Sequence, residues 1–304
     1  ELFDLPLEDL LAHFGTTPQK KQRIKDIYGN VSQSVFAGSR AMQGEESKNM
    51  SFYSPSHTNL CRVILGWKLE SRNSYRWNDS SNGTWGYLPY DDESNPFLGH
   101  RAIRYCFENL TIFKTQLRAL IKAHEKHENI RILLPFITSV EEIKEARKII
   151  EEIAGNNSKI KIGIMIETPA AVFLTLNLAK HVDFLSIGTN DLSQYIMAAD
   201  RGNDKVSGLC SHYQPAVIRA IAMTMTDANA AGCEVEICGE AAADTRFIPV
   251  LIGMGIKNFS VSPTAILKVR KAIAECDYKE AIDVTRQVIS LETEAEVKDY
   301  LQQD

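Results

Sequence analysis

Two short apolar runs, separated by a segment with helical character, form the clearest pattern in the chain. Ile162 to Ile166 and Val182 to Ile187 have the length and continuous apolar character of strands buried on both faces. Ala170 to Ala179, between them, is predicted to be a helix. A strand, a helix and a second strand make the repeating unit of a parallel α/β protein. An acid follows each strand: Glu167 follows the first directly, and Asp191 comes just past the second.

The same alternation of apolar runs and helices extends from residue 131 to residue 262. It predicts five strand–helix units, with a helix at Ser139 to Ile153 that has a serine N-cap and Glu142 in the capping-box position. The expected strands are 131–137, 162–166, 182–187, 233–238 and 258–261, and a helix is expected at Asp244 to Ile252, between the last two. No glycine-rich GxGxxG turn follows any of them. A run of this length favours an α/β fold of the (β/α)8 TIM-barrel type over a doubly wound sheet.

The N-terminal third does not follow this pattern. Residues 1 to about 30 alternate leucines with charged residues, as amphipathic helices do. Residues 30 to 92 are rich in Ser, Asn, Gly and aromatic residues, and Leu60 to Gly66 is the one strand-like run there. We therefore divide the chain into an irregular or divergent N-terminal segment, residues 1–92, and a barrel domain, residues 93–304.

Composition narrows the classes of function. The formal charge of −5 and the pI near 5.9 give no electrostatic reason to expect nucleic acid or an anionic membrane surface as a partner. Apolar runs stay far below the ~18 residues of a membrane span, so we expect no membrane insertion. Six cysteines without CxxC spacing, and an N-terminal stretch unlike a signal peptide, predict a cytoplasmic protein.

The residues at the expected strand ends carry the candidate chemistry. In a barrel, side chains at the carboxyl ends of neighbouring strands lie side by side, which would bring Glu167 and Asp191 together. Carboxylate oxygens suit Mg²⁺, with Mn²⁺ as the alternative. The competing interpretation is purely structural. Either acid would then be the cap of the helix that starts beside it, at Thr168 or at Leu192.

Groups that bind anions or transfer protons surround these acids in the sequence. Gly188, Thr189 and Asn190 lead into a helix, an arrangement whose backbone N–H groups can cradle an anion. Arg201 and Arg101 offer forked donors suited to a carboxylate or phosphate, although a solvated loop arginine is the default explanation. Cys238 precedes Gly239, which permits close approach of a ligand. Its thiol is a candidate proton donor or, alternatively, an inert core cysteine.

Several motifs at these positions resemble the phosphoenolpyruvate-utilising enzymes, most closely the C-terminal phosphoenolpyruvate-binding domain of Enzyme I of the bacterial sugar phosphotransferase system. The similarity covers residues 93 to 274. Its motifs are NPFLGHRAIR, FKTQLRALIKA, ILLPFI, GIMIETPAAV, VDFLSIGTNDLSQYIMAADRGND, ICGEAA and LIGMGIKNFSVSP.

The resemblance implies an Mg²⁺-dependent phosphotransferase domain built as a (β/α)8 barrel. Glu167 and Asp191 would hold the metal, and Asn190, Asp191, Arg101 and Arg201 would contact the substrate. Cys238 would protonate the enolate at C3, giving pyruvate. The phosphoryl group would pass to a histidine on a separate domain or chain and then to the carrier HPr of sugar uptake. A homodimer is also implied.

The chain departs from the family before residue 93. The family motifs containing FRTE and resembling IRTxDxGxDK, which each supply a phosphate-binding arginine, are missing. Arg40 and Arg76 stand at comparable distances upstream and are the candidates to replace them. This departure keeps open an alternative function, a catalytically impaired homologue that serves as a regulatory or interaction module. A related metal-dependent lyase or aldolase is a third possibility.

Overall fold

The structure is a computed structural model that describes residues 93–126, 130–155, 159–262 and 265–302, together with two earlier strands. The strands are β1 (Phe52–Tyr53), β2 (Leu60–Ile64), β3 (Ile130–Leu134), β4 (Lys161–Ile166), β5 (Phe184–Gly188), β6 (Glu234–Cys238) and β7 (Asn258–Phe259). The α-helices are α4 (Ile103–Glu108), α5 (Leu110–Lys126), α6 (Val140–Ala154), α7 (Pro169–Phe173), α8 (Thr175–Leu178), α9 (Thr189–Ile196), α10 (Pro215–Ala231), α11 (Ile248–Gly253), α12 (Ile266–Glu275), α13 (Tyr278–Ser290) and α14 (Glu294–Tyr300).

The described strands form one sheet in which β1 to β7 follow each other in chain order. β1 pairs antiparallel with β2, and every later pair, from β2–β3 to β6–β7, is parallel. Parallel strands in chain order, joined by helices, fit the predicted (β/α)8 barrel, and the α/β class with a parallel sheet is confirmed. The strand-like run at Leu60 to Gly66 is confirmed as β2. The other predictions for residues 1–92 lie outside the described residues.

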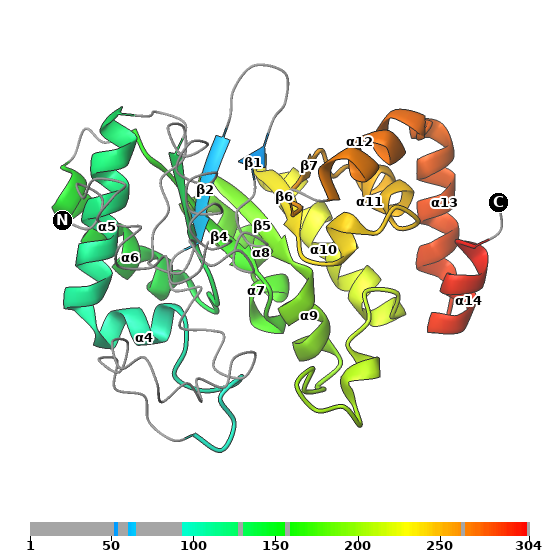
Figure 1. Cartoon of the computed structure of the whole chain (residues 1–304), viewed down its shortest axis with the longest axis horizontal. Helices are drawn as coiled ribbons and strands as arrows, with labels where there is room; N and C mark the ends of the chain where they lie inside the picture. Colours follow the sequence, from blue (N-terminus) through cyan, green and yellow to red (C-terminus); the bar gives the residue numbers. More distant parts are fainter. Residues whose placement is uncertain are drawn as a thin grey trace, which may run out of the picture.

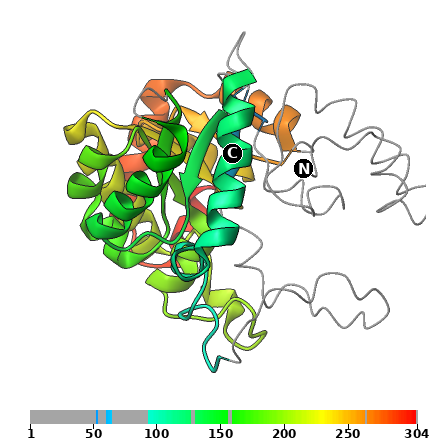
Figure 2. The same ribbon diagram turned by 90° about the vertical axis from the view of Figure 1, so that its left-hand side faces the viewer.

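The helices surround the sheet and cover its apolar strands. In Figure 1, α5 and α6 lie at one end of the sheet and α11 to α14 lie at the other. Figure 2 shows α5 upright beside the strands of the first of these ends. All five residues of β5 are buried, as the continuous apolar run predicted. Among the described helices, none combines the length and the apolar character needed to cross a bilayer.

The two faces of the sheet bury different sets of side chains. Ile132, Ile164 and Leu185 belong to the large core that the strands share with the outer helices. Leu133, Met165 and Phe184, each offset by one residue, form a separate small cluster against which Cys238 packs. Period-2 alternation accounts for this separation. The second face therefore carries Cys238 next to an apolar layer.

Two predicted helices differ from the observed ones. The helix expected at residues 170–179 is divided into α7 and α8, and the Thr175 hydroxyl donates to the carbonyl oxygens of Ala171 and Val172 at this junction. Hydroxyl groups that bond backward to carbonyls are a recognised cause of helix distortion. The helix expected from Asp244 begins only at Ile248, because the Asp244 carboxylate accepts the N–H of Arg246 in a turn. By contrast, α6 has the predicted capping box of Ser139 and Glu142.

Candidate active site at the carboxyl ends of the strands

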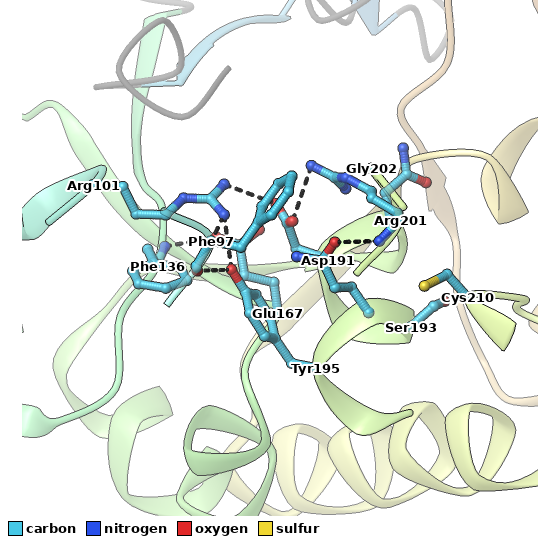
Figure 3. Close-up of polar contacts among 12 residues, drawn as sticks. Phe97, Arg101, Phe136, Glu167, Asp191, Ser193, Tyr195, Arg201, Gly202 and Cys210 are labelled. Atoms are coloured by element: carbon cyan, nitrogen blue, oxygen red, sulfur yellow. Dashed lines mark hydrogen bonds and ion pairs between the residues drawn. The ribbon is translucent and has the colours of Figure 1, made fainter. Parts of the chain in front are cut away.

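The predicted acids and arginines converge where β4 and β5 end (Figure 3). Glu167 follows β4 directly, and Asp191 lies in the first turn of α9, which follows β5. Arg101 enters from the loop before α4, and Arg201 from the loop after α9. The parallel sheet thus brings together residues from four separate segments of the chain.

Asp191 is the residue that both arginines contact. Its carboxylate is only 5% exposed. Arg101 Nη2 lies 3.4 Å from Asp191 Oδ2, and Arg201 Nη2 lies 3.0 Å from Asp191 Oδ1. Arg101 is itself buried at 3% exposure, whereas the Arg201 side chain is 32% exposed. One buried carboxylate therefore holds two guanidinium groups on opposite oxygens.

Glu167 is held from the neighbouring strand. Its carboxylate, 1% exposed, accepts a 2.6 Å hydrogen bond at Oε1 from the backbone N–H of Phe136, just beyond β3. A Cβ at Gly188 would lie 3.0 Å from Glu167 Oε2 and 2.7 Å from Met165 Sδ. Glycine at the end of β5 therefore leaves the room that the second oxygen of Glu167 occupies.

The structure argues against helix capping as the role of these acids. The N-cap of α7 is Thr168, whose hydroxyl accepts from the N–H of Ala171. The N-cap of α9 is Gly188, which makes no side-chain capping bond. Asp191 lies within the first turn of α9, where the helix dipole favours a negative charge. Glu167 and Asp191 are thus buried near the ends of two neighbouring strands for a reason other than capping.

Aromatic side chains line the arginines, and the sequence pattern had not indicated them. The Phe97 ring lies 5.4 Å from the guanidinium carbon of Arg101 and 5.5 Å from that of Arg201. The Tyr195 hydroxyl accepts a 2.7 Å hydrogen bond from Arg101 Nη1 and donates to the carbonyl oxygen of Phe97. Burial raises the pKa of Tyr195 well above its usual value, so the phenol stays protonated and able to donate.

One of these aromatic contacts had a signal in the sequence. Tyr195 lies four residues after Asp191 in a helix, and residues at this spacing share one helical face. Phe97 and Arg201 belong to loops far apart in the sequence that meet only after folding. Their contact had no comparable local signal.

The loop after β6 packs against the start of α9. The Asn190 side-chain oxygen accepts from the N–H of Glu240 at 2.9 Å, and the Thr189 hydroxyl donates to the carbonyl oxygen of Cys238 at 2.9 Å. Gly239 has a φ of +91°, and a Cβ there would lie 2.3 Å from Thr189 Oγ1. Glycine is thus required at this close approach. The Asn190 side chain thus faces the loop after β6 through its oxygen, and its place in an anion cradle stays a prediction.

Cys238 lies at the end of β6, half-buried. Its sulfur is 3.6 Å from the hydroxyl of Ser186, which donates to it, and 3.4 Å from the carbonyl oxygen of Ile187, to which the thiol donates. Both partners belong to β5, the strand that leads to Asp191. The cysteine therefore faces the same end of the sheet as the acids and arginines.

Some predicted site residues cannot be placed in this way. Arg40 and Arg76 lie outside the described residues. Among the residues that the structure describes, no three His, Cys, Asp or Glu side chains are grouped to hold a metal ion. Glu167 and Asp191 are a pair of hard oxygen donors, and Asp191 Oδ1 is buried without a hydrogen-bond donor of good geometry, despite the nearby Arg201. These two residues fit a divalent cation that completes its shell with ligand or water oxygens.

Comparisons with known proteins agree with the motifs. Residues 75–278 match the family described as PEP-utilising enzyme, PEP-binding domain. The phosphoenolpyruvate-protein phosphotransferase of Haloferax volcanii is 42% identical over 228 residues, 72% of this chain and 40% of that protein. The Bacillus subtilis protein of the same name is 43% identical over 225 residues, 71% of this chain and 39% of that protein.

Two further matches are more distant. An Escherichia coli protein named phosphoenolpyruvate-dependent phosphotransferase system is 38% identical over 220 residues, 70% of this chain and 29% of that protein. The chain thus spans about two fifths, or less, of the curated relatives it matches. A solved citrate lyase structure from Burkholderia xenovorans is 19% identical, covers 62% of this chain and 65% of that chain, and has a TM-score of 0.42.

Proposed function

Because the chain belongs to the phosphoenolpyruvate-utilising enzymes, whose phosphoenolpyruvate-binding domain it carries, we propose that the site around Asp191 binds phosphoenolpyruvate together with Mg²⁺ or Mn²⁺ and donates the phosphoryl group to a protein histidine. The observation that carries the proposal is the buried Asp191 carboxylate flanked by Arg101 and Arg201, beside Glu167.

The charges of the site support an anionic ligand bound with a cation. The guanidinium groups of Arg101 and Arg201 and the carboxylates of Glu167 and Asp191 balance each other. A divalent cation held by the two acids would leave the site positive and would neutralise charge on the transferring phosphoryl group. A ligand with both a carboxylate and a phosphate group suits such a site.

The two arginines have distinct environments that suit distinct tasks. Arg101 is buried and fixed by Asp191, Tyr195 and the Phe97 ring, so its orientation is set before any ligand arrives. Arg201 is partly exposed and lies in a loop, so it can turn toward a ligand oxygen while remaining near Asp191. Preorganised donors of this kind cost no reorganisation when charge moves in the reaction.

Cys238 supplies the proton that the reaction needs in this proposal. The bond between the phosphorus atom and the enol oxygen breaks, and the phosphorus atom bonds to a histidine nitrogen on a separate domain or chain. The resulting enolate takes the thiol proton at C3 and becomes pyruvate. The Ser186 hydroxyl, which donates to the sulfur, would stabilise the thiolate left behind.

The partners of the whole protein follow from the relatives. We propose that the phosphoryl group passes from a phosphohistidine domain to an HPr-type carrier, in the cytoplasm, and that the chain forms a homodimer. The names of the matched relatives support a phosphotransferase. The convergence of acids and arginines favours this function over the impaired regulatory module, since such a module would not need four charged residues held together.

Isothermal titration calorimetry tests the proposal. The protein, with Mg²⁺ at millimolar concentration, is titrated with phosphoenolpyruvate and compared with Glu167→Ala and with the exposed-surface control Glu141→Ala. We expect binding to the wild type and the control, and at least about a tenfold loss of affinity in Glu167→Ala. Absence of binding at millimolar ligand, or unchanged binding by Glu167→Ala, would overturn the proposal.

A further inference from the structure

Phe136 has a backbone conformation that is unusual for its type. It follows β3, is 2% exposed and has a φ of +60°, in the left-handed region. A bulky side chain in this region is strained, and such strain persists only where the surrounding structure imposes it. Left-handed residues of this kind cluster at functional sites. The contacts that Phe136 makes in this conformation therefore indicate its role.

The backbone of Phe136 contacts the cation side of the site. Its N–H donates to Glu167 Oε1 at 2.6 Å, a short hydrogen bond to a carboxylate that is 1% exposed. Hydrogen bonds to ionised acceptors are stronger than neutral ones, and burial strengthens them further. This bond fixes one oxygen of Glu167.

The ring of Phe136 contacts the anion side of the site. Its centroid lies 4.9 Å from the guanidinium carbon of Arg101 and 4.7 Å from that of Arg104. The Tyr195 ring, whose hydroxyl accepts from Arg101, lies 5.7 Å away with an interplanar angle of 56°. Figure 3 shows Phe136 next to Arg101, on the side of the site where Glu167 lies. A guanidinium group held against an aromatic ring away from water is attracted by the electron-rich ring face.

We propose that Phe136 is a positioning residue that orders both halves of the site at once, Glu167 through its backbone N–H and Arg101 through its ring. Core packing alone does not account for it, because Phe136 belongs to neither apolar cluster of the core and its ring lies against two guanidinium groups. The inference rests on the proposed function, since it assigns Glu167 to the cation and Arg101 to the anionic ligand.

The two contacts can be separated by substitution. Phe136→Leu removes the ring face and keeps the backbone N–H. We therefore expect phosphoenolpyruvate, in the presence of Mg²⁺, to bind about tenfold more weakly. Mn²⁺ binding without phosphoenolpyruvate, followed by electron paramagnetic resonance, should change by less than about twofold because Glu167 keeps its hydrogen bond. Phe136→Tyr restores the ring and should recover most of the phosphoenolpyruvate affinity.

The control is Phe113→Leu, the same change at a buried phenylalanine of α5 (1% exposed), which should leave both affinities unchanged. Should Phe136→Leu fail to fold, as judged by circular dichroism, Phe136→Met provides the same comparison. Wild-type phosphoenolpyruvate affinity in the Leu or Met variant would overturn the inference, as would equal losses of Mn²⁺ and phosphoenolpyruvate binding. If the wild type itself binds no phosphoenolpyruvate, the proposed function fails instead, and the inference fails with it.

Discussion

Arg101 is the most constrained charged residue of the site. It is 3% exposed, and its guanidinium group contacts the Asp191 carboxylate, the Tyr195 hydroxyl and two aromatic rings. A guanidinium group satisfies such surroundings because it is planar and weakly hydrated and offers donors in several directions. A lysine ammonium group at the same place would neither lie flat on the rings nor contact both oxygen partners.

Arg101→Lys keeps the positive charge but removes the planar, forked guanidinium group. The variant therefore tests which of these two properties ligand binding requires. We expect about a 10- to 100-fold loss of phosphoenolpyruvate affinity, measured by calorimetry in the presence of Mg²⁺. The same change at the exposed Arg118 of α5 is the control and should have no effect. Retained affinity in Arg101→Lys would mean that charge alone is needed at this position.

Cys238 can be tested without an acceptor histidine. The group that protonates the enolate at C3 also removes a proton from pyruvate in the reverse direction. With Mg²⁺ and inorganic phosphate in deuterated water, we expect the chain to exchange the methyl protons of pyruvate, seen as loss of the nuclear magnetic resonance signal. Cys238→Ala should slow this exchange at least about 100-fold, whereas Cys276→Ala should not. Equal exchange rates in wild type and Cys238→Ala would assign the proton to another group.

The residues of the site were predictable to different degrees, for a physical reason. The acids and arginines were predictable because each lies beside a strand end or in a recognisable motif, where sequence position implies spatial position. The contact of Phe136 with Arg101 was not, and neither was that of Phe97 with Arg201, because each depends on how loops from separate elements meet. The positive φ of Phe136 also has no signature in residue type, since phenylalanine rarely adopts it.

At the scale of elements, a polar cluster connects the C-terminal helix to the rest of the fold. Asp244, in the turn before α11, lies 3.2 Å from His212 Nε2 and also accepts from the Tyr213 hydroxyl. Gln214, at the start of α10, donates to Glu294 of α14 at 3.0 Å. The ammonium group of Lys298 in α14 lies 5.6 Å from the Tyr213 ring centroid. The cluster thus joins the segments that precede α10 and α11 to the helix α14.

Asp244→Asn should reveal this connection through the pH dependence of stability. Burial alone would raise the pKa of Asp244, but hydrogen bonds from His212, Tyr213 and Arg246 hold it far below its usual value. The pKa of Asp244 is lower in the folded state than in the unfolded state, where it is ~4. The stabilisation that the charged Asp244 provides is therefore fully present above pH ~4 and is lost as pH falls below that value. We expect the free energy of unfolding of the variant to be about 2–3 kcal/mol lower than that of the wild type at pH 7. Between pH 5 and pH 2, the variant should lose less stability than the wild type does.

Urea denaturation at a series of pH values measures this difference. The control is Asp299→Asn, which lies on the C-terminal helix α14 but outside the cluster. Its stability should depend on pH as that of the wild type does. Parallel pH profiles for Asp244→Asn and the wild type would mean that Asp244 does not link the C-terminal helix in its charged form.

Element boundaries show where local sequence signals suffice. The capping box at Ser139 and Glu142 marked the start of α6 correctly, because both partners lie within four residues. The boundary of α11 was wrong because Asp244 forms a local turn and contacts distant partners, and neither property follows from its position before an apolar run. The local turn at Asp244 thus takes the place of the first helical turn that apolar periodicity had predicted.

For the whole molecule, the repeated strand–helix pattern was enough to predict the strand order. Short apolar runs joined by helices leave parallel pairing in chain order as the simplest way to bury each strand, and the sheet has this order. Between residues 30 and 92 the sequence offered only β2 as a recognisable run, because the polar and aromatic residues there follow neither period. Arg40 and Arg76, in this part of the chain, remain predicted ligands of the phosphate group.

In the proposed function one site binds phosphoenolpyruvate and a divalent cation together, and a calorimetric binding cycle can measure this coupling. Phosphoenolpyruvate is titrated into the protein with Mg²⁺ and with a chelator, and Mg²⁺ is titrated with and without phosphoenolpyruvate. Shared occupancy predicts that each ligand strengthens the other by the same factor, about tenfold or more. Phosphoenolpyruvate binding that is equally tight with Mg²⁺ and with the chelator would contradict the account.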